Sequence, residues 1–289
     1  MLETFEKKAA FEKRLAEVIV GWPLYRTLKV TGDVLVTVDS YGQRAVPGIE
    51  LPLEIDRYCE TCKQIQRWQL KQPHDQGGFP KTSSEITFIR FDCKNCESGS
   101  LLVFLRVRVD EETIVHIVKV GQYPALELNP SPILASAMTR NDLALYRHAL
   151  TCRNSNFGIG AVAYLRRIVE NQINYLLDLI ADAAKASDPD SPLLERLSEM
   201  KGEKRFSEKI DYAAEMLPKT IRRGGHNPIA TLHDLTSEGL HNKSDEECVD
   251  IFDRCKLAFE YVIERLKEDH DKDALYQEAM KALARKKAR

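Results

Sequence analysis

The sequence predicts an α+β protein, in which a β-rich N-terminal domain precedes an all-α helical bundle. Two changes of hydrophobic period predict this division. Apolar residues recur at helical spacing over 3–18, alternate in steps of two over about 25–125, and return to helical spacing beyond "LELNPSP" (126–132). The prolines and asparagine of that last stretch are typical of a linker. We therefore predict domains over residues 1–128 and 129–289.

The composition is that of an ordinary globular protein. The chain has 289 residues, of which 43% are hydrophobic and 30% charged, and its formal net charge is −2. This charge argues against binding a polyanion by bulk attraction alone. No stretch reaches the roughly 18 apolar residues that span a bilayer. The mixed charges of the first 20 residues exclude a signal or transit peptide, so we expect a cytoplasmic protein without a membrane partner.

Four segments of the N-terminal domain read as strands. They are rich in β-branched and aromatic residues, they alternate in places, and polar turns such as "PHDQGG" separate them. The segments are "DVLVTV" (33–38), "EITFIRF" (85–91), "LLVFLRVRV" (101–109) and "TIVHIVKV" (113–120).

The C-terminal domain carries start and stop signals for several helices. The strongest apolar stripe covers 159–185, and Ser191 followed by Pro192 begins a further helix. Another is predicted over about 205–217. A helix from Asn227-Pro228 should run to about Gly239. Ser244 and Glu247 then form a capping box ahead of a helix from 245 to about 268. The strip "HDLTSEGLHNKSDEEC" (233–248) is therefore interpreted mainly as a helix junction.

The N-terminal domain contains two Cys-x-x-Cys pairs, "CETC" and "CKNC", which provide Cys59, Cys62, Cys93 and Cys96. Four thiolates suit tetrahedral Zn²⁺, and a closed set of protein ligands indicates a structural site. The 30 residues between the pairs exceed the usual spacing, which a long arm can absorb. Unrelated thiols and a redox dithiol are the alternatives, although neither pair lies at a helix start. We predict a structural zinc in a zinc ribbon.

Basic and aromatic residues alternate around the first cysteine pair. Such a pattern can follow a nucleic-acid backbone and stack on its bases. The alternative is a solvated strand face with two core aromatics, favoured by the acids Asp56 and Glu60 nearby. The candidate nucleic-acid residues are Arg57, Lys63, Arg67, Trp68 and Lys71.

Two stretches of the helical half, "FGIGAVAYLRRIVENQINYLL" and "LHDLTSEGLHNKSDEEC", together resemble a helical family of uncharacterised function. That family is found with restriction and abortive-infection proteins and is similar to the HEPN superfamily. "GQYPALELNPSP" resembles the join between such a domain and a zinc ribbon. The resemblance covers about residues 120–265 and implies a prokaryotic, defence- or mobile-element-associated role.

The catalytic pattern of active HEPN ribonucleases is not reproduced. Those enzymes carry an arginine and a histidine with four to six residues between them. Here His241 fits the histidine position, but His233 stands near the arginine position with seven residues intervening. On a continuous helix the two rings would lie about 12 Å apart along the axis, too far to share a metal ion unless Gly239 breaks the helix. His241 and His233 are the candidate catalytic residues, and a packing or ligand-sensing histidine is the alternative.

Two function classes follow. The first is a non-enzymatic binding or regulatory protein that recognises nucleic acid or protein through the zinc ribbon and forms a homodimer through the helical bundle. The second is a degenerate, metal-independent HEPN-type ribonuclease that uses His241. An accessory factor acting with DNA is a weaker third possibility. Arg166 and Glu170 have the spacing of a helix-surface ion pair, or alternatively point inward toward His241.

Overall fold

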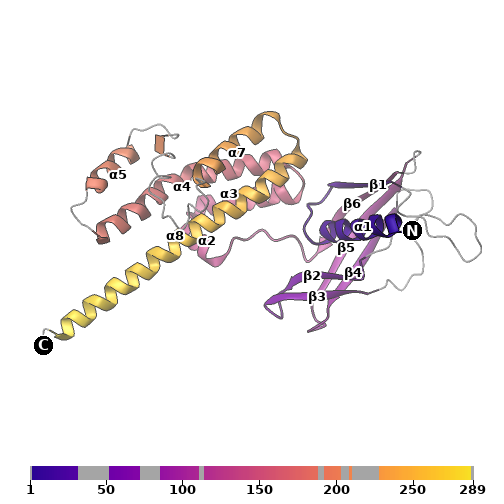
Figure 1. The fold of residues 1–289 in the computed structure, drawn as a ribbon, viewed down its shortest axis with the longest axis horizontal. Helices are drawn as coiled ribbons and strands as arrows, with labels where there is room; N and C mark the ends of the chain where they lie inside the picture. Colours follow the sequence, from indigo (N-terminus) through magenta and orange to yellow (C-terminus); the bar gives the residue numbers. More distant parts are fainter. Residues whose placement is uncertain are drawn as a thin grey trace, which may run out of the picture. The chain divides into compact units, whose positions relative to one another are not determined.

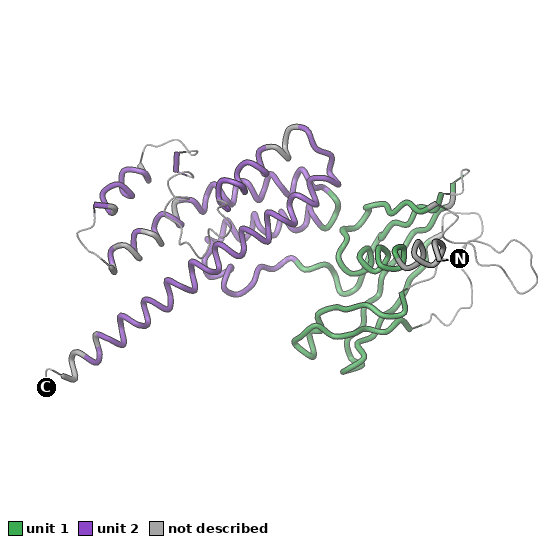
Figure 2. Tube along the Cα trace, viewed as in Figure 1, with its two compact units in different colours: residues 1–127, 154–156 green, residues 128–153, 157–289 purple. Residues whose placement is uncertain are grey.

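The computed structural model describes residues 2–31, 52–71, 85–110, 114–187, 192–202, 208–209 and 228–287. The chain forms two compact units, which are described separately (Figure 2). Unit 1 comprises residues 1–127 and 154–156, and unit 2 comprises 128–153 and 157–289. The N-terminal half is built around an antiparallel sheet and the C-terminal half from helices, which confirms the α+β class.

The described residues of unit 1 form helix α1 and one six-stranded antiparallel sheet (Figure 1). The spatial order of the strands is β1-β6-β5-β4-β3-β2, so four of the five strand pairs join strands that are consecutive in sequence, and β1 closes the far edge beside β6. The predicted strand 33–38 lies outside the described residues. The elements are α1 (Leu2–Val20), β1 (Thr27–Thr31), β2 (Glu54–Cys59), β3 (Gln64–Lys71), β4 (Glu85–Cys93), β5 (Ser100–Val109) and β6 (Ile114–Tyr123).

Helix α1 supplies the apolar cover for one face of the sheet. Its buried residues Leu15, Val18 and Ile19 pack with inward-facing residues of the central strands. Because side chains alternate across a strand, residues such as Ile89 and Leu105 are buried there while their neighbours face the other way. The apolar period of two seen in the sequence therefore reflects a sheet that is covered by a helix on one side.

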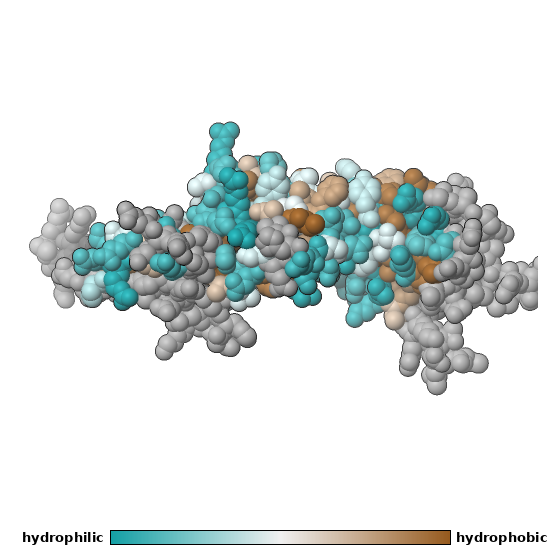
Figure 3. Space-filling model, turned by 90° about the horizontal axis from the view of Figure 1, so that it is seen from above, coloured by the Kyte–Doolittle hydropathy of each residue, from teal (hydrophilic) through white to brown (hydrophobic). Residues whose placement is uncertain are grey.

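Unit 2 is built on three packed helices, α4, α7 and α8, with shorter helices beside them. The core is formed mainly by aliphatic residues of α4 and aromatic and aliphatic residues of α8, such as Leu165, Ile168 and Phe252. On the face drawn in Figure 3, hydrophobic residues reach the surface in small patches among hydrophilic ones. The helices are α2 (Pro132–Ala137), α3 (Arg140–Asn154), α4 (Gly158–Ser187), α5 (Pro192–Gly202), α7 (Pro228–Asn242) and α8 (Asp245–Lys287).

The helix starts were predicted more closely than the helix ends. Helices α4, α5, α7 and α8 begin within one residue of the expected positions, but α7 continues through Gly239 to Asn242. A glycine inside a helix costs only about 1 kcal/mol, which packing of α7 against α4 and α8 offsets. Helix α8 extends to Lys287 rather than 268 because no glycine or proline interrupts it. Of the predicted helix 205–217, only residues 208–209 are described, and they are helical.

Among the described helices, none combines the length and the apolar character required to cross a membrane.

Candidate metal centre

The four predicted cysteine ligands lie together at one end of the sheet. Cys59 ends β2 and Cys93 ends β4, and their partners Cys62 and Cys96 lie in the turns that follow. All four sulfur atoms are within 4.8 Å of one another. The pairs Cys59–Cys96 and Cys62–Cys93 have Sγ–Sγ distances of 3.6 and 3.9 Å. The cluster can therefore hold a metal ion, and each ion contact would come from a protein thiolate.

Strand register explains why cysteines 30 residues apart in sequence meet in space. Strand β3 pairs with β2 on one side and with β4 on the other, and Trp68 lies opposite Cys93. The turn after Cys93 consequently runs alongside the start of β3, next to the turn that contains Cys62. The intervening residues 72–84 lie outside the described part of the chain. The sheet itself thus brings the two pairs together.

The two turns share one backbone design. In each, the amide four residues after the first cysteine donates to that cysteine's carbonyl oxygen: Lys63 to Cys59 at 2.8 Å and Glu97 to Cys93 at 3.0 Å. Lys63 and Glu97 both adopt left-handed backbone conformations, with φ of 56° and 55°. A non-glycine residue seldom adopts this conformation. Its repetition after both pairs indicates turns shaped to aim two sulfurs each toward a common point.

Groups around the cluster donate hydrogen bonds to the sulfurs. The side-chain amide of Asn95 donates to Sγ of Cys62 over 3.3 Å. Backbone hydrogen bonds at Gly99 and Ser98 lower the pKa of Cys96 to about 6. Asn95 also lowers the pKa of Cys62, but desolvation and the neighbouring thiols outweigh it and raise that pKa to about 11. Four adjacent thiols resist joint ionisation because their negative charges would repel one another. A bound cation would favour the ionised form of all four. Hydrogen bonds of this kind orient and tune metal ligands.

Trp68 and Gly99 close the inner side of the cluster. Trp68 is 3% exposed, and its indole Nε1 donates to the carbonyl oxygen of Arg57 at 3.0 Å. A Cβ at Gly99 would lie 3.0 Å from the Trp68 ring and 3.2 Å from Sγ of Cys59. Only glycine therefore fits without displacing the ring or the sulfur. Cys59 and Cys93 are each 1% exposed, so the inner half of the cluster is part of the core of unit 1.

The five residues predicted to contact nucleic acid lie in different surroundings. Trp68 faces the core, and the guanidinium of Arg57 lies over its ring, 5.5 Å from the centroid. Lys63 pairs with Glu60, and Arg67 pairs with Glu54 and Asp56. Lys71 lies on the exposed side of β3, opposite Arg90 of β4. The five residues therefore do not form one patch, and only Lys71 combines exposure with the absence of an ion pair among the described residues.

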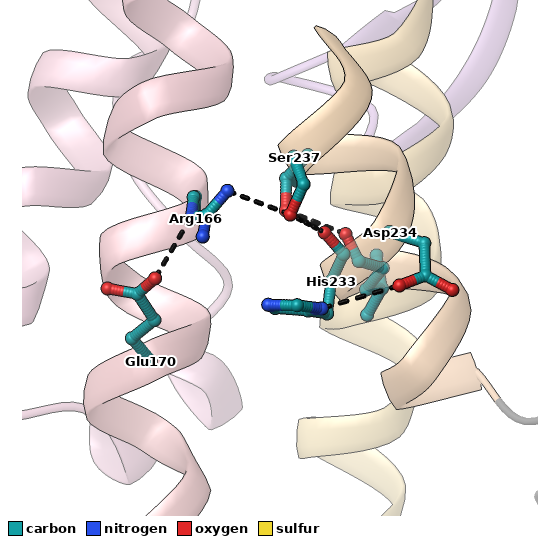
Figure 4. A network of polar contacts seen from close by, with 7 residues as sticks. Arg166, Glu170, His233, Asp234 and Ser237 are labelled. Carbon is teal, nitrogen blue, oxygen red and sulfur yellow. Dashed lines mark hydrogen bonds and ion pairs between the residues drawn. The ribbon is translucent and has the colours of Figure 1, made fainter. Parts of the chain in front are cut away.

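The candidate histidines belong to α7. The His233 ring points toward α4 (Figure 4), and its Nδ1 lies 3.4 Å from a carboxylate oxygen of Asp234. The backbone at His241 is helical, but its side chain lies outside the described part of the structure. Because α7 is unbroken from Pro228 to Asn242, the two residues remain separated by about 12 Å along the axis. The structure therefore does not bring them together.

Arg166 of α4 lies against this part of α7. Its Nη1 donates to Oγ of Ser237 over 2.7 Å, and its Nε donates to Glu170 over 2.9 Å (Figure 4). Ser237 in turn donates to the carbonyl oxygen of His233. The ion pair within α4 is therefore present, and the described partner of Arg166 across the bundle is Ser237.

A second buried polar cluster in unit 2 was missed by the sequence analysis. Asp142 is 2% exposed and accepts from the side-chain amides of Asn171 and Gln172 at 2.7 and 2.8 Å. Thr139 also caps the start of α3: the amide of Asp142 donates to the Thr139 hydroxyl at 3.1 Å, and this hydroxyl donates to the Asp142 carboxylate at 2.9 Å. The pattern Thr-x-x-Asp was the available signal. This cluster ties α3 to α4 and is structural.

Comparison with protein-family models, with curated proteins and with solved structures finds no match. The function must therefore be argued from the residues of this chain.

Proposed function

We propose that the protein is a non-enzymatic binding and regulatory protein. In this proposal a zinc-ribbon unit recognises nucleic acid or protein, and the helical unit joins two copies of the chain. The main support for a non-enzymatic role is the cluster of four thiols where two hairpins meet. A metal ion bound by four protein ligands has no free position for a substrate. The resemblance of the helical half to HEPN-like domains supports a prokaryotic defence- or mobile-element-associated role.

Zinc is the metal that best suits the cluster. A tetrahedral ion about 2.3 Å from each sulfur would place the sulfurs about 3.8 Å apart. The Sγ–Sγ distances of 3.6 and 3.9 Å are close to that value. Zinc would hold the β2–β3 and β4–β5 hairpins together, and the free energy of binding would contribute to folding of unit 1.

The metal content of the full chain tests this role. Protein purified without added metal should contain one zinc per chain by mass spectrometry of the metal. The matched control is Cys152→Ser, which removes a thiol of α3 that is outside the cluster and should leave the zinc content unchanged. Folded protein that contains no metal, or metal retained in full by a Cys59→Ser, Cys93→Ser double variant, would refute the zinc ribbon.

The C-terminal part of α8 is the surface that we propose joins two chains. Tyr276, Met280 and Leu283 are 61%, 45% and 61% exposed, and their spacing places them on one face of the helix. The residues before this stripe are mainly acidic, and those after it are basic: residues 268–273 carry four acids and one lysine, while 281–287 carry four bases and no acid. Antiparallel pairing of two α8 helices would place each acidic segment beside a basic one.

The dimer is tested by Met280→Glu, which puts a charge in the middle of the stripe. Sedimentation of the full chain should change from dimer to monomer. Leu257→Glu is the matched control, because Leu257 is a 71% exposed leucine on the same helix outside the stripe. A monomeric wild-type protein at high micromolar concentration, or a dimer that survives Met280→Glu, would contradict the proposed contact.

A metal-independent ribonuclease is the second candidate, and one observation favours it. The sequence has no arginine at the expected spacing before His241, but Arg166 reaches α7 from α4 and binds Ser237, one turn before His241. A cation in this place could stabilise charge on a phosphoryl group. The test is incubation with mixed RNA in the presence of a chelator. Cleavage abolished by His241→Ala and by Arg166→Ala, in proteins that remain folded, would favour the enzyme over the binding protein.

A further inference from the structure

Unit 1 exposes the face of its sheet that lies opposite α1. Along β4 and β5 the inward residues Ile89 and Leu105 are 1% exposed, whereas the outward residues Phe88 and Phe104 are 46% and 38% exposed. We call this outward side the open face. Its side chains come from five strands: Lys29 of β1, His116 and Tyr123 of β6, Phe104, Arg106 and Arg108 of β5, Phe88 and Arg90 of β4, and Lys71 of β3.

Aromatic rings occupy the centre of the open face. Phe88 and Phe104 lie directly opposite each other on β4 and β5, with ring centroids 6.3 Å apart and planes tilted by 44°. The next strand places Gly121 opposite Phe104, and a Cβ there would meet the Phe104 ring at 3.5 Å. The ring therefore rests on a backbone without a side chain. Tyr123 follows on β6 and is 67% exposed.

Cations flank the rings on two sides. Arg106 and Arg108 follow Phe104 on the same side of β5, and Arg108 lies in one row with His116 and Lys29. Arg90 and Lys71 form a row on the other side of the rings. In the described residues Arg106, Arg108, Lys29 and Lys71 form no ion pair.

Among the described residues, the acids on and beside the open face are already engaged. Asp92 accepts hydrogen bonds from Arg90 and Ser100, both at 2.8 Å. Asp110 pairs with His116 at 2.8 Å. The half-buried Glu54 and the exposed Asp56 lie on the edge strand β2 and pair with Arg67. The centre of the open face therefore carries an excess of positive charge, although the net charge of the chain is −2.

We propose that the open face binds single-stranded nucleic acid, with bases stacked on Phe88, Phe104 and Tyr123 and phosphates held by Arg106 and Arg108. This proposal rests on the recognition function proposed above and names its ligand class. Stacking on aromatic side chains combined with a cationic track is how proteins bind single strands without reading sequence.

Two features favour a single strand over other partners. Successive rows on one side of a strand are separated by about 7 Å, close to the backbone repeat of an extended nucleic-acid strand. A protein-binding surface is usually depleted of lysine, whereas the open face carries Lys29 and Lys71 beside its arginines. A duplex would hide its base faces from the rings.

Fluorescence anisotropy with labelled 12-nucleotide dT and U strands tests the proposal on the zinc-loaded full chain. We expect binding that weakens as salt rises. Phe104→Leu retains apolar bulk but removes the ring, and should weaken binding by about fivefold or more. Arg106→Gln with Arg108→Gln should weaken binding further and lower the salt slope by about 1.4, because each phosphate contact on a single strand contributes about 0.7.

The matched control is Lys13→Gln, which removes an exposed cation of unit 1 on α1, the helix that covers the opposite face of the sheet. It should change affinity less than twofold. Zinc content and melting temperature of each variant separate lost binding from lost folding. Binding of only the dT or only the U strand supports the proposal and identifies the preferred strand. Failure to bind either strand, equal affinity for a 12-base-pair duplex, or binding unaffected by both open-face variants would overturn it, while a retained zinc content would leave the zinc ribbon standing.

Discussion

The two units connect distant segments of chain by different chemistry. Unit 1 concentrates the connection at one point, where four thiols from two hairpins lie within 4.8 Å of one another. Unit 2 spreads it over many contacts: a large apolar core, the Asp142 cluster between α3 and α4, and a bidentate pair between Arg153 and Asp253. The difference follows from shape, because one helix covers a single face of the sheet, whereas helices in a bundle bury residues against several neighbours.

This comparison predicts that unit 1 fails at a single substitution. Cys59→Ser removes a buried ligand and should destabilise unit 1 by on the order of 5 kcal/mol, because lost metal binding is lost folding free energy. Calorimetry of the full chain should show one transition lowered or missing and the transition of unit 2 in place. Cys152→Ser, in unit 2, should leave the unit 1 transition unaltered. If Cys59→Ser melted like the wild type, the thiols would not be the connection that holds unit 1 together.

The next largest loss of stability is expected where the backbones of two helices of unit 2 are in contact. A Cβ at Gly158, the first residue of α4, would lie 2.0 Å from the carbonyl oxygen of Asp245 and 2.5 Å from the amide nitrogen of Val249. Gly158→Ala must therefore move α4 away from α8 and should cost about 3 kcal/mol.

Gly160 provides the control for that substitution, since a Cβ there would meet only the Cys152 side chain, at 3.1 Å for its Sγ. Gly160→Ala should cost far less in denaturant unfolding followed by circular dichroism. If Gly158→Ala and Gly160→Ala lowered the free energy of unfolding equally, the start of α4 could shift freely. The close contact between α4 and α8 would then not be critical for the stability of unit 2.

A smaller loss is expected from the Asp142 cluster. Asp142→Ala leaves the side-chain amides of Asn171 and Gln172 without their acceptor and removes the acceptor of the Thr139 hydroxyl, so we expect a cost of about 2 kcal/mol. Asp273→Ala, on the exposed part of α8, should be nearly neutral. The measurement is chemical unfolding of unit 2. A neutral Asp142→Ala would mean that the apolar core alone fixes α3 on α4.

The contrast between the units also explains what the sequence could predict. Spacing identified the four cysteines because a pair of ligands from one turn requires the local pattern Cys-x-x-Cys. The capping box at Ser244 is equally local, and both of its hydrogen bonds are present. Strand order and register depend on pairings between distant segments, and these could not be read from a period of two.

Two other features escaped prediction for physical reasons. The end of α8 was placed near residue 268, because the apolar stripe that packs on the bundle stops there, while the helix continues to Lys287 as an exposed extension. The open face of the sheet was missed for a different reason. Alternation along one strand shows which residues share a side, but it does not show which residues of other strands lie next to them. Phe88 and Phe104 become neighbours only through the register of β4 and β5.

The smallest predicted effect concerns the local contact at the start of α8 and depends on pH. The backbone amide of Ser244 donates to Glu247 at 2.9 Å, and this bond, with that of the Ser244 hydroxyl, lowers the pKa of Glu247. A carboxyl group whose pKa is lower in the folded state stabilises the protein above its unfolded pKa, near 4.3, and the gain is lost as pH falls through the folded value. Ser244→Ala should cost about 1 kcal/mol at neutral pH.

Glu247→Gln isolates the charge within that contact. Its melting temperature for unit 2 should lie below that of the wild type at pH 7, and the two should converge as the pH falls below 4, because the wild-type carboxylate then becomes protonated. Glu246→Gln, at the adjacent exposed position, should not show the same convergence. If the melting temperature of Glu247→Gln stayed below that of the wild type by a constant amount from pH 7 to pH 3, the charge of Glu247 would not contribute. The stability of this junction would then come from hydrogen-bond geometry alone. The charge of Glu247 would then add nothing to the contacts that stabilise unit 2 at the start of α8.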